Sequence, residues 1–311
     1  MPTTTCSYEV DDNLKIFVPV TINGKTFRFL FDTGTNETLI NYETAKQLDM
    51  TSVDHRLCEL NSPDTFFVDS VYYLNSELFI QGMSFSKSAL CLDKFNISFS
   101  RSANYEGYDG ILGNRDIKKK NWLFDFKNKK VTLSDTMDAL SPFINEYDQV
   151  LELKINDDYS ALHVDMCVED SVCCTFLFDT GWGTLIELNN EKDNYKFYSD
   201  FAFRDSFIVH LSDRIHFPNQ AVLLQTFKMN DMLFKHLSAS VNLSNIIKEN
   251  VIAVPFLRRF EFMLYDSDNQ KICLFYSEKG HGYKGNKEAE IIDFSVKKYL
   301  EKENMKLIEN K

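Results

Sequence analysis

The sequence predicts an all-β protein built from two similar lobes, and three observations support this prediction. Apolar and polar residues alternate in short stretches bounded by Asn, Asp and Gly, which is typical of antiparallel strands. The 311 residues include 27 Phe and 14 Tyr, enough large side chains to fill β-rich cores. The hexapeptide Phe-Leu-Phe-Asp-Thr-Gly occurs at residues 29–34 and again at 176–181. Such a repeat indicates a duplicated unit, so we expect two antiparallel, β-barrel-like lobes with a few short helices.

The first lobe should present its copy of the repeat at the end of a hairpin. Strands are expected over residues 14–22 and 26–31, with a turn at 23–24, and the second strand leads to Asp32. After the repeat, residues 41–48 have the cap and composition of a short helix.

The second lobe should repeat this arrangement. Strands over 162–168 and 172–178 would lead to Asp179. Residues 134–148 are irregular and are expected to connect the lobes. After the second lobe, apolar residues recur at helical spacing among Lys and Glu, which predicts a C-terminal helix. The expected divisions are residues 1–140 for the N-terminal lobe, 141–280 for the C-terminal lobe and 281–311 for the helical tail.

The repeat would bring together two carboxyl groups, those of Asp32 and Asp179. Two carboxyl groups a few ångströms apart cannot both ionise, so they share one proton. The ionised member can take a proton from a water between them while the other donates to a substrate carbonyl, which is general acid–base hydrolysis of an amide. Glycines that keep a Cβ out of each turn, and hydroxyls that hydrogen-bond across the two-fold, should support the pair. These residues are Thr33, Gly34, Thr180 and Gly181.

Further segments carry a resemblance to a known family. Residues 18–25 followed by 29–35 resemble the opening hairpin and catalytic turn of the aspartic proteases, in a single-chain, two-lobed form of the retropepsin-like and pepsin-like family. Residues 109–113, Asp-Gly-Ile-Leu-Gly, resemble the family's second signature, a segment that lies beside the catalytic loop. The resemblance implies an aspartic endopeptidase with Asp32 and Asp179 as its dyad, an extended substrate in an interlobe cleft, and no metal or organic cofactor.

The resemblance also implies which residues contact the substrate. Aspartic proteases carry a flap, a hairpin that closes over the substrate, and the order of segments along the chain places it at a predicted turn. The residues of this turn are Asn61, Ser62, Pro63 and Asp64. Trp182, next to the second turn, is a candidate wall of a substrate pocket.

The second lobe departs from the family pattern at three places. Thr35 follows the first Asp-Thr-Gly and could donate a hydrogen bond to the catalytic carboxylate, whereas the bulky Trp182 follows the second. The apolar-apolar-Gly segment appears as Val-Ile-Ala at 251–253, a replacement expected to forbid a positive φ. The loop after the second turn is one residue shorter than the loop after the first.

These departures leave two alternatives open. The first is an active endopeptidase, which the retention of both Asp and both Thr residues favours because a buried carboxylate pair is costly to keep without a use. The second is a catalytically inert module that binds a peptide or protein segment, with Trp182 occluding the water site.

Composition restricts the partners. The net charge of −12 argues against nucleic acid or an anionic membrane surface as the main partner, so an extended peptide or protein is expected instead. Both Asp residues come from one chain, so a monomer suffices. Seven cysteines at irregular spacing, without a Cys-x-x-Cys, suggest reduced thiols and no metal site. The first residues lack a basic and then apolar signal, which together with reduced thiols predicts a cytoplasmic protein.

Overall fold

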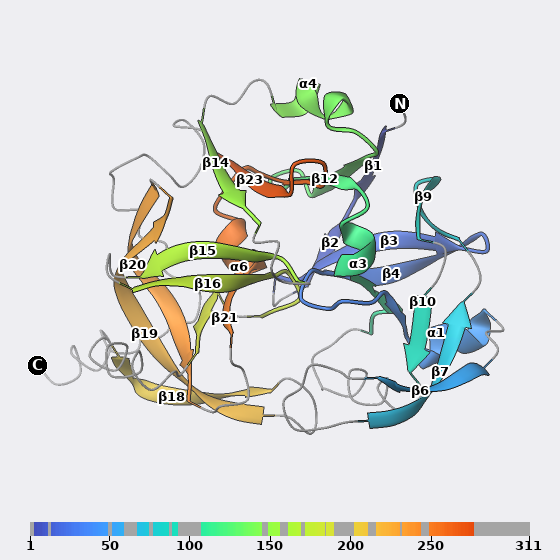
Figure 1. Ribbon diagram of the computed structural model, residues 1–311, viewed down its shortest axis with the longest axis horizontal. Helices are drawn as coiled ribbons and strands as arrows, with labels where there is room; N and C mark the ends of the chain where they lie inside the picture. Colours follow the sequence, from blue (N-terminus) through green and yellow to red (C-terminus); the bar gives the residue numbers. More distant parts are fainter. Residues whose placement is uncertain are drawn as a thin grey trace, which may run out of the picture.

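In the computed structural model, β-strands dominate both halves of the chain and form three sheets (Figure 1). The structure describes residues 3–11, 14–48, 52–58, 67–74, 77–86, 89–92, 107–144, 149–155, 161–168, 172–183, 185–189, 202–210, 216–230, 232–243 and 249–276. The helices among them are short: α1 (Tyr42–Gln47), α3 (Asn114–Ile117), the 3-10 helix η1 (Met137–Ala139), α4 (Ser141–Ile144) and α6 (Val254–Leu257). The predicted all-β, two-lobed fold is confirmed. The predicted C-terminal helix lies outside the described residues.

The first Asp-Thr-Gly turn follows a hairpin formed by β3 (Ile16–Ile22) and β4 (Lys25–Asp32). Asn23 and Gly24, between the strands, have φ values of 49° and 77°. A two-residue hairpin turn requires such left-handed values, and Asn and Gly adopt them readily. The last four residues of β4 are buried, so the hairpin predicted from the sequence leads the chain into the interior of the lobe.

The N-terminal lobe is a ten-stranded sheet with β4 near its middle. Its strand order is β6-β7-β10-β5-β11-β4-β3-β8-β9, and β2 pairs with β3. The remaining members are β2 (Glu9–Val10), β5 (Leu39–Ile40), β6 (Ser52–Cys58), β7 (Phe67–Leu74), β8 (Leu78–Ile80), β9 (Met83–Ser86), β10 (Ala89–Leu92) and β11 (Gly110–Gly113). Most pairs are antiparallel, but β11 runs parallel to β4.

The C-terminal lobe is a seven-stranded sheet of the order β15-β16-β21-β17-β20-β19-β18. Its members are β15 (His163–Val168), β16 (Val172–Asp179), β17 (Ile186–Leu188), β18 (Ala202–His210), β19 (His216–Met229), β20 (Met232–Asn242) and β21 (Asn250–Ala253). β15 also pairs with β19, so part of this sheet closes into a barrel. In Figure 1 the hairpin β15–β16 extends from the centre of the molecule in the direction opposite to β3–β4.

A third sheet joins the lobes. Its order is β1-β13-β12-β22-β23-β14, so β1, β13 and β12 lie on one side of the central pair contact and β22, β23 and β14 on the other. These strands are β1 (Thr3–Ser7), β12 (Asn121–Asp125), β13 (Lys130–Ser134), β14 (Gln149–Lys154), β22 (Phe262–Asp266) and β23 (Lys271–Tyr276). The equivalent strands β12 and β22 are antiparallel neighbours at the middle of the sheet. The joint between the lobes is therefore a continuous hydrogen-bonded sheet.

The segment after β13 covers the shared sheet. It contains η1 and α4, which lie over β12, β23 and β14 in Figure 1. Leu140 is fully buried, and Met137 and Ile144 pack against the same apolar cluster. The rest of that cluster is Leu123, Leu264, Cys273, Phe275 and Phe262. The irregular connection predicted over 134–148 thus supplies apolar side chains to the joint between the lobes.

The cysteines differ from the sequence-based expectation. Cys167 and Cys173 lie directly opposite each other on β15 and β16 and form a disulfide, so the prediction of reduced thiols is wrong for this pair. Cys6, Cys174 and Cys273 are not in disulfide bonds. Burial raises the pKa of the Cys6 thiol to about 11 and that of Cys273 to about 12, so both stay protonated at neutral pH.

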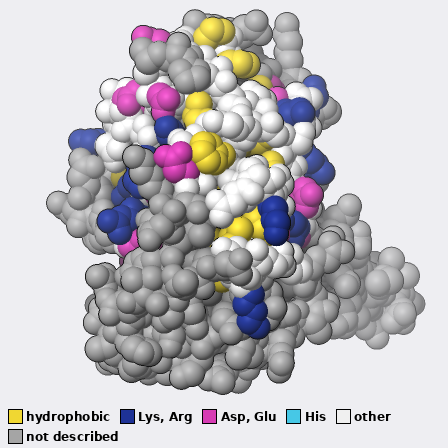
Figure 2. Space-filling view, turned by 90° about the vertical axis from the view of Figure 1, so that its right-hand side faces the viewer, with side chains coloured by type: hydrophobic (Ala, Val, Ile, Leu, Met, Phe, Trp, Pro, Cys, Tyr) yellow, Lys and Arg dark blue, Asp and Glu magenta, His cyan; other side chains and the backbone are white. Residues whose placement is uncertain are grey.

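The surface of the described part carries mixed charge. Figure 2 shows acidic and basic side chains interspersed on one face, without a patch of a single sign among the described residues. The lysines with ion-pair partners include Lys120, which pairs with Asp135, and Lys119, which pairs with Asp116. Within the described segments, no helix is long and apolar enough to cross a membrane.

Candidate active site

Two matching strand pairs position the two Asp-Thr-Gly turns. Asp32 ends β4, which pairs in parallel with β11 so that Asp32 lies opposite Gly113. Asp179 ends β16, which pairs in parallel with β21 so that Asp179 lies opposite Ala253. In each lobe the outer strand of the hairpin and the parallel strand hold the aspartate strand from both sides. The duplicated sequence therefore produces a duplicated local fold.

The threonines of the two turns hydrogen-bond to each other's strands. The Thr33 N–H donates to Thr180 Oγ1 and the Thr180 N–H donates to Thr33 Oγ1, each at 3.0 Å. The Thr180 hydroxyl donates to the carbonyl of Phe31 at 2.7 Å, and the Thr33 hydroxyl donates to the carbonyl of Phe178. Both threonines are at most 2% exposed. The hydrogen bonds expected across the two-fold are present, and they connect the lobes beside the aspartates.

The two glycines explain how closely the turns approach. A Cβ on Gly34 would lie 2.3 Å from Cγ of Asp179, and a Cβ on Gly181 would lie 2.4 Å from Cγ of Asp32. Real Cβ contacts are never this short, so each carboxyl group occupies the space that a side chain on the opposite turn would need. Glycine is required here by close approach, and the geometry brings both carboxyl groups to one place.

The carboxyl group of Asp32 has three hydrogen-bond donors. The N–H groups of Gly34 and Thr35 donate to Oδ1 at 2.9 Å and 3.0 Å, and the Thr35 hydroxyl donates to Oδ2 at 2.8 Å. Hydrogen bonds donated to a carboxylate stabilise its charged form. The hydroxyl expected at position 35 is thus directed at the aspartate.

The carboxyl group of Asp179 has a different environment. The Gly181 N–H donates to its Oδ1 at 2.8 Å. Burial raises the pKa of the Asp179 carboxyl well above its ordinary value of 3.8, and the charge of Asp32 and a hydrogen bond with it act in the same direction. The Gly181 hydrogen bond and the positive charge of Lys15 oppose the shift. This shift favours the protonated form of the Asp179 carboxyl group.

Of the predicted substrate-contact residues, the structure describes Trp182 but not the flap turn. Trp182 is partly buried. Its backbone N–H donates to the carbonyl of Asp179 at 3.4 Å, so its backbone continues the turn. The predicted flap turn at Asn61, Ser62, Pro63 and Asp64 lies outside the described residues.

The glycine beside the first turn has a different role from the one expected. Gly113 has φ −88° and Ala253 has φ −123°, so neither position needs a positive φ, and that part of the prediction is wrong. A Cβ on Gly113 would lie 2.3 Å from the carbonyl carbon of Glu37, because the loop after Asp32 packs on it. Ala253 is tolerated in the second lobe, where the loop is one residue shorter and β17 pairs with β21 in a different register.

Sequence reasoning missed the residues that hold the loop after Asp32. Thr38 and Asp116 are buried and hydrogen-bond to each other at 2.6 Å. The available signal was a polar residue directly before the apolar pair of β5 and an acidic residue three positions after Gly113. Within the described part of the chain, no group of three or more His, Cys, Asp and Glu side chains could hold a metal ion.

Comparison with known proteins agrees with this geometry. Residues 18–113 match the aspartyl protease family. None of the curated proteins matches the chain. The crystal structure of an aspartic proteinase from Irpex lacteus is similar with a TM-score of 0.56, over 89% of this chain and 98% of that chain, at 14% sequence identity. An identity this low establishes the fold alone. The chain therefore matches the aspartyl protease family over residues 18–113 and has the aspartic proteinase fold over both lobes.

Proposed function

We propose that the protein is an endopeptidase that hydrolyses peptide bonds with a water activated by Asp32 and Asp179. The observation that carries the proposal is the pairing of the two turns: each carboxyl group lies against the glycine of the opposite turn. Paired carboxyl groups of different protonation provide a general base and a general acid within reach of one substrate carbonyl.

The surroundings of the two carboxyl groups assign their roles. Asp32, which accepts hydrogen bonds from three donors, is the ionised member. It takes a proton from the water while the water oxygen attacks the carbonyl carbon. Asp179, whose pKa is raised by burial and by Asp32, donates its proton to the carbonyl oxygen. The resulting tetrahedral diol collapses when Asp32 returns its proton to the amide nitrogen and Asp179 takes one back from a hydroxyl. The C–N bond breaks and both carboxyl groups return to their starting states.

The substrate in this proposal is an extended peptide or protein segment that crosses the joint between the lobes. Extended segments bind proteins by adding backbone hydrogen bonds to strand edges, and side-chain pockets then give selectivity. Trp182 follows the Asp179 turn directly, so its indole is a candidate wall of one pocket. One chain supplies both aspartates, so the proposed active form is a monomer.

The alternative is an inert peptide-binding module with the same fold. The feature that favours it is Trp182, which stands where Thr35 in the first lobe donates to its aspartate. In that case the aspartate pair would persist without turnover, and peptide binding would occur without cleavage.

The test is cleavage of a complex peptide library between pH 3 and pH 8. Wild type, Asp32→Asn and Asp179→Asn are compared with Asp266→Asn, a matched control whose buried carboxyl group lies in β22 of the shared sheet. The proposal is supported if wild type and Asp266→Asn cleave peptides while Asp32→Asn and Asp179→Asn do not. Full cleavage by Asp32→Asn overturns the mechanism, and peptide binding by wild type without cleavage favours the alternative.

A further inference from the structure

The loop that follows Asp32 is held at each of its residues by the segment that begins at Gly113. The Asn114 N–H donates to the carbonyl of Thr35 at 2.7 Å, and the Arg115 N–H donates to the carbonyl of Asn36 at 2.9 Å. The guanidinium group of Arg115 pairs with the Glu37 carboxylate at 3.0 Å. That ion pair is solvent-exposed and therefore contributes little energy.

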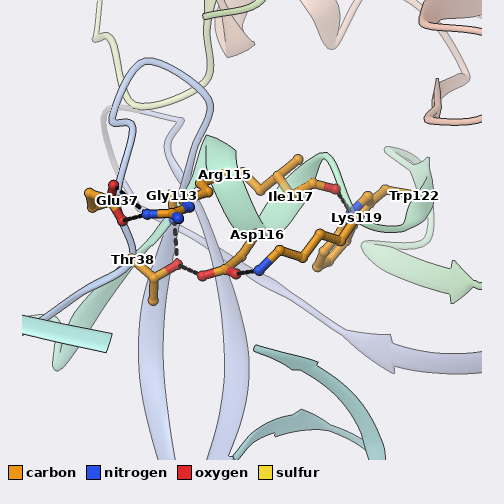
Figure 3. Close-up of polar contacts among 8 residues, drawn as sticks. All are labelled: Glu37, Thr38, Gly113, Arg115, Asp116, Ile117, Lys119 and Trp122. Carbon is orange, nitrogen blue, oxygen red and sulfur yellow. Dashed lines mark hydrogen bonds and ion pairs between the residues drawn. The ribbon is translucent and has the colours of Figure 1, made fainter. Parts of the chain in front are cut away.

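The buried part of this contact is centred on Asp116, as Figure 3 shows. The Thr38 hydroxyl donates to Oδ2 of Asp116 at 2.6 Å and accepts from the Gly113 N–H at 3.1 Å. Lys119 Nζ lies 2.5 Å from Oδ1 of Asp116, so the buried carboxylate is paired. Asp116 is 4% exposed and Thr38 is 2% exposed. Buried, paired hydrogen bonds of this kind fix geometry more strongly than exposed ones.

The network connects to the aspartate through a short path. Thr38 and Thr35 are the ends of the same four-residue loop, and Thr35 supplies two of the three donors to Asp32. Gly113, which donates to Thr38, lies opposite Asp32 in the parallel strand pair. The position of the Thr35 hydroxyl therefore depends on a loop anchored at both ends, by Asp32 and by Asp116.

The equivalent segment of the second lobe has different residues. Val254, Pro255 and Phe256 follow Ala253 as Asn114, Arg115 and Asp116 follow Gly113. Pro255 has no N–H to donate, and Phe256 is buried against the rings of Phe227, Phe234 and Phe260. The buried carboxylate of Asp116 therefore has no counterpart at the equivalent position, 256, of the second lobe.

We propose that Asp116 is a positioning residue of the active site, which acts through Thr38 to hold the Thr35 hydroxyl on Asp32. The inference rests on the proposed function, because it assigns Asp116 to the base side of the same reaction. Asp116 does not touch the substrate in this proposal. Its loss should lower the rate of the chemical step and leave substrate binding largely unchanged.

Four variants test the proposal in the full-length chain. Thr38→Val removes the hydroxyl at almost constant volume and Asp116→Ala removes the acceptor, whereas Thr38→Ser and Asp116→Asn keep the hydrogen bond. We expect Thr38→Val and Asp116→Ala to lower kcat about 10- to 100-fold with KM changed less than about twofold. Thr38→Ser and Asp116→Asn should retain most of the wild-type kcat. Asp266→Ala is the control for removing a buried carboxylate, since Asp266 accepts two hydrogen bonds from Asn269 in a turn of the shared sheet.

A second readout does not require turnover. In wild type and each variant, carbon-13 NMR of labelled Asp follows the carboxyl signal of Asp32 with pH. Among the described residues, Asp32 and Lys15, which lies before β3, are the charged groups that act on the Asp179 carboxyl, and no variant alters them. Loss of the Thr35 donor should move the Asp32 midpoint upward in Thr38→Val but not in Thr38→Ser.

The outcomes separate this inference from the proposed function. If Asp32→Asn cleaves as well as wild type, the proposed function fails. If Asp32→Asn is inactive while folded Thr38→Val keeps full kcat and an unmoved Asp32 midpoint, only the role of Asp116 is overturned. Equal losses in Thr38→Val and Thr38→Ser, or in Asp116→Ala and Asp266→Ala, would also contradict it. If wild type cleaves nothing, the NMR readout tests the inference alone: an Asp32 midpoint that Thr38→Val leaves unmoved overturns it.

Discussion

Gly113→Ala and Ala253→Gly form a matched pair of perturbations at equivalent positions of the two lobes. A Cβ on Gly113 would lie 2.3 Å from the carbonyl carbon and oxygen of Glu37 and 2.8 Å from the nitrogen of Thr38. Carbon atoms pack best at about 3.5–4.0 Å, so the backbone of the loop has to move by roughly 1 Å. Overpacking against side chains costs about 1–3 kcal/mol, and a backbone clash belongs at the upper end, near 3 kcal/mol.

Ala253→Gly has a different physical basis. Ala253 is fully buried in an extended conformation, so the change removes one buried methyl group and adds backbone freedom to the unfolded chain. These losses are about 0.8 kcal/mol and about 0.5–1 kcal/mol, which together give about 1.5 kcal/mol. Gly113→Ala should therefore cost about twice as much stability as Ala253→Gly.

Urea unfolding followed by tryptophan fluorescence measures both changes, because Trp122 is fully buried in the shared sheet. The comparison holds where the dependence of the unfolding free energy on urea is the same in all three proteins. Gly113→Ala should also lower peptide cleavage, since the displaced loop carries Thr35, while Ala253→Gly should retain it. If Gly113→Ala costs no more than Ala253→Gly, the steric account of the glycine is refuted.

Three further predictions concern the dyad and the hairpin behind it. Thr33→Val and Thr180→Val should each cost about 2 kcal/mol by leaving a buried N–H without its acceptor, and a double-mutant cycle should show less than additive loss. Because the pKa of Asp179 is raised, the native state holds a proton that the unfolded state releases above about pH 4. The stability from that proton is present at low pH and lost as pH rises through the native pKa, so Asp179→Asn should gain stability relative to wild type at pH 7 but not at pH 3 in urea unfolding. Replacing Cys167 and Cys173 together by Ser should cost about 2 kcal/mol, and a thiol reductant should then lower the urea midpoint of wild type but not of the variant.

The hairpin that leads to each aspartate was predictable because its sequence pattern occurs in both halves of the chain. The hairpin before Asp32 follows from alternating apolar residues and the turn residues Asn23 and Gly24, which adopt the φ values that such a turn needs. The identical six-residue repeats then give the second hairpin by analogy. The equivalence of 122–125 and 262–266 was also visible in their patterns.

Pairing across the molecule was not predictable from these patterns. Strands β12 and β22 lie side by side in the shared sheet, but an apolar strand offers the same backbone donors and acceptors to any neighbour. The same limit applies to Thr38 and Asp116, which are 78 residues apart in sequence and meet only because β5, β11 and α3 converge. The disulfide had a local signal: Cys167 and Cys173 are equally far from the centre of the hairpin turn.

The two lobes hold their aspartates by different means, and this difference has a chemical consequence. A symmetric pair of identical chains surrounds its two carboxyl groups identically, so nothing in the protein decides which one keeps the shared proton. Here Thr35 donates to Asp32 while Trp182 follows Asp179, and the buried aromatic Phe256 stands at the position that Asp116 occupies beside the first turn. In the proposed mechanism, these surroundings favour the charge on Asp32 and the proton on Asp179, so the sequence differences between the lobes would assign the base and the acid before a substrate binds.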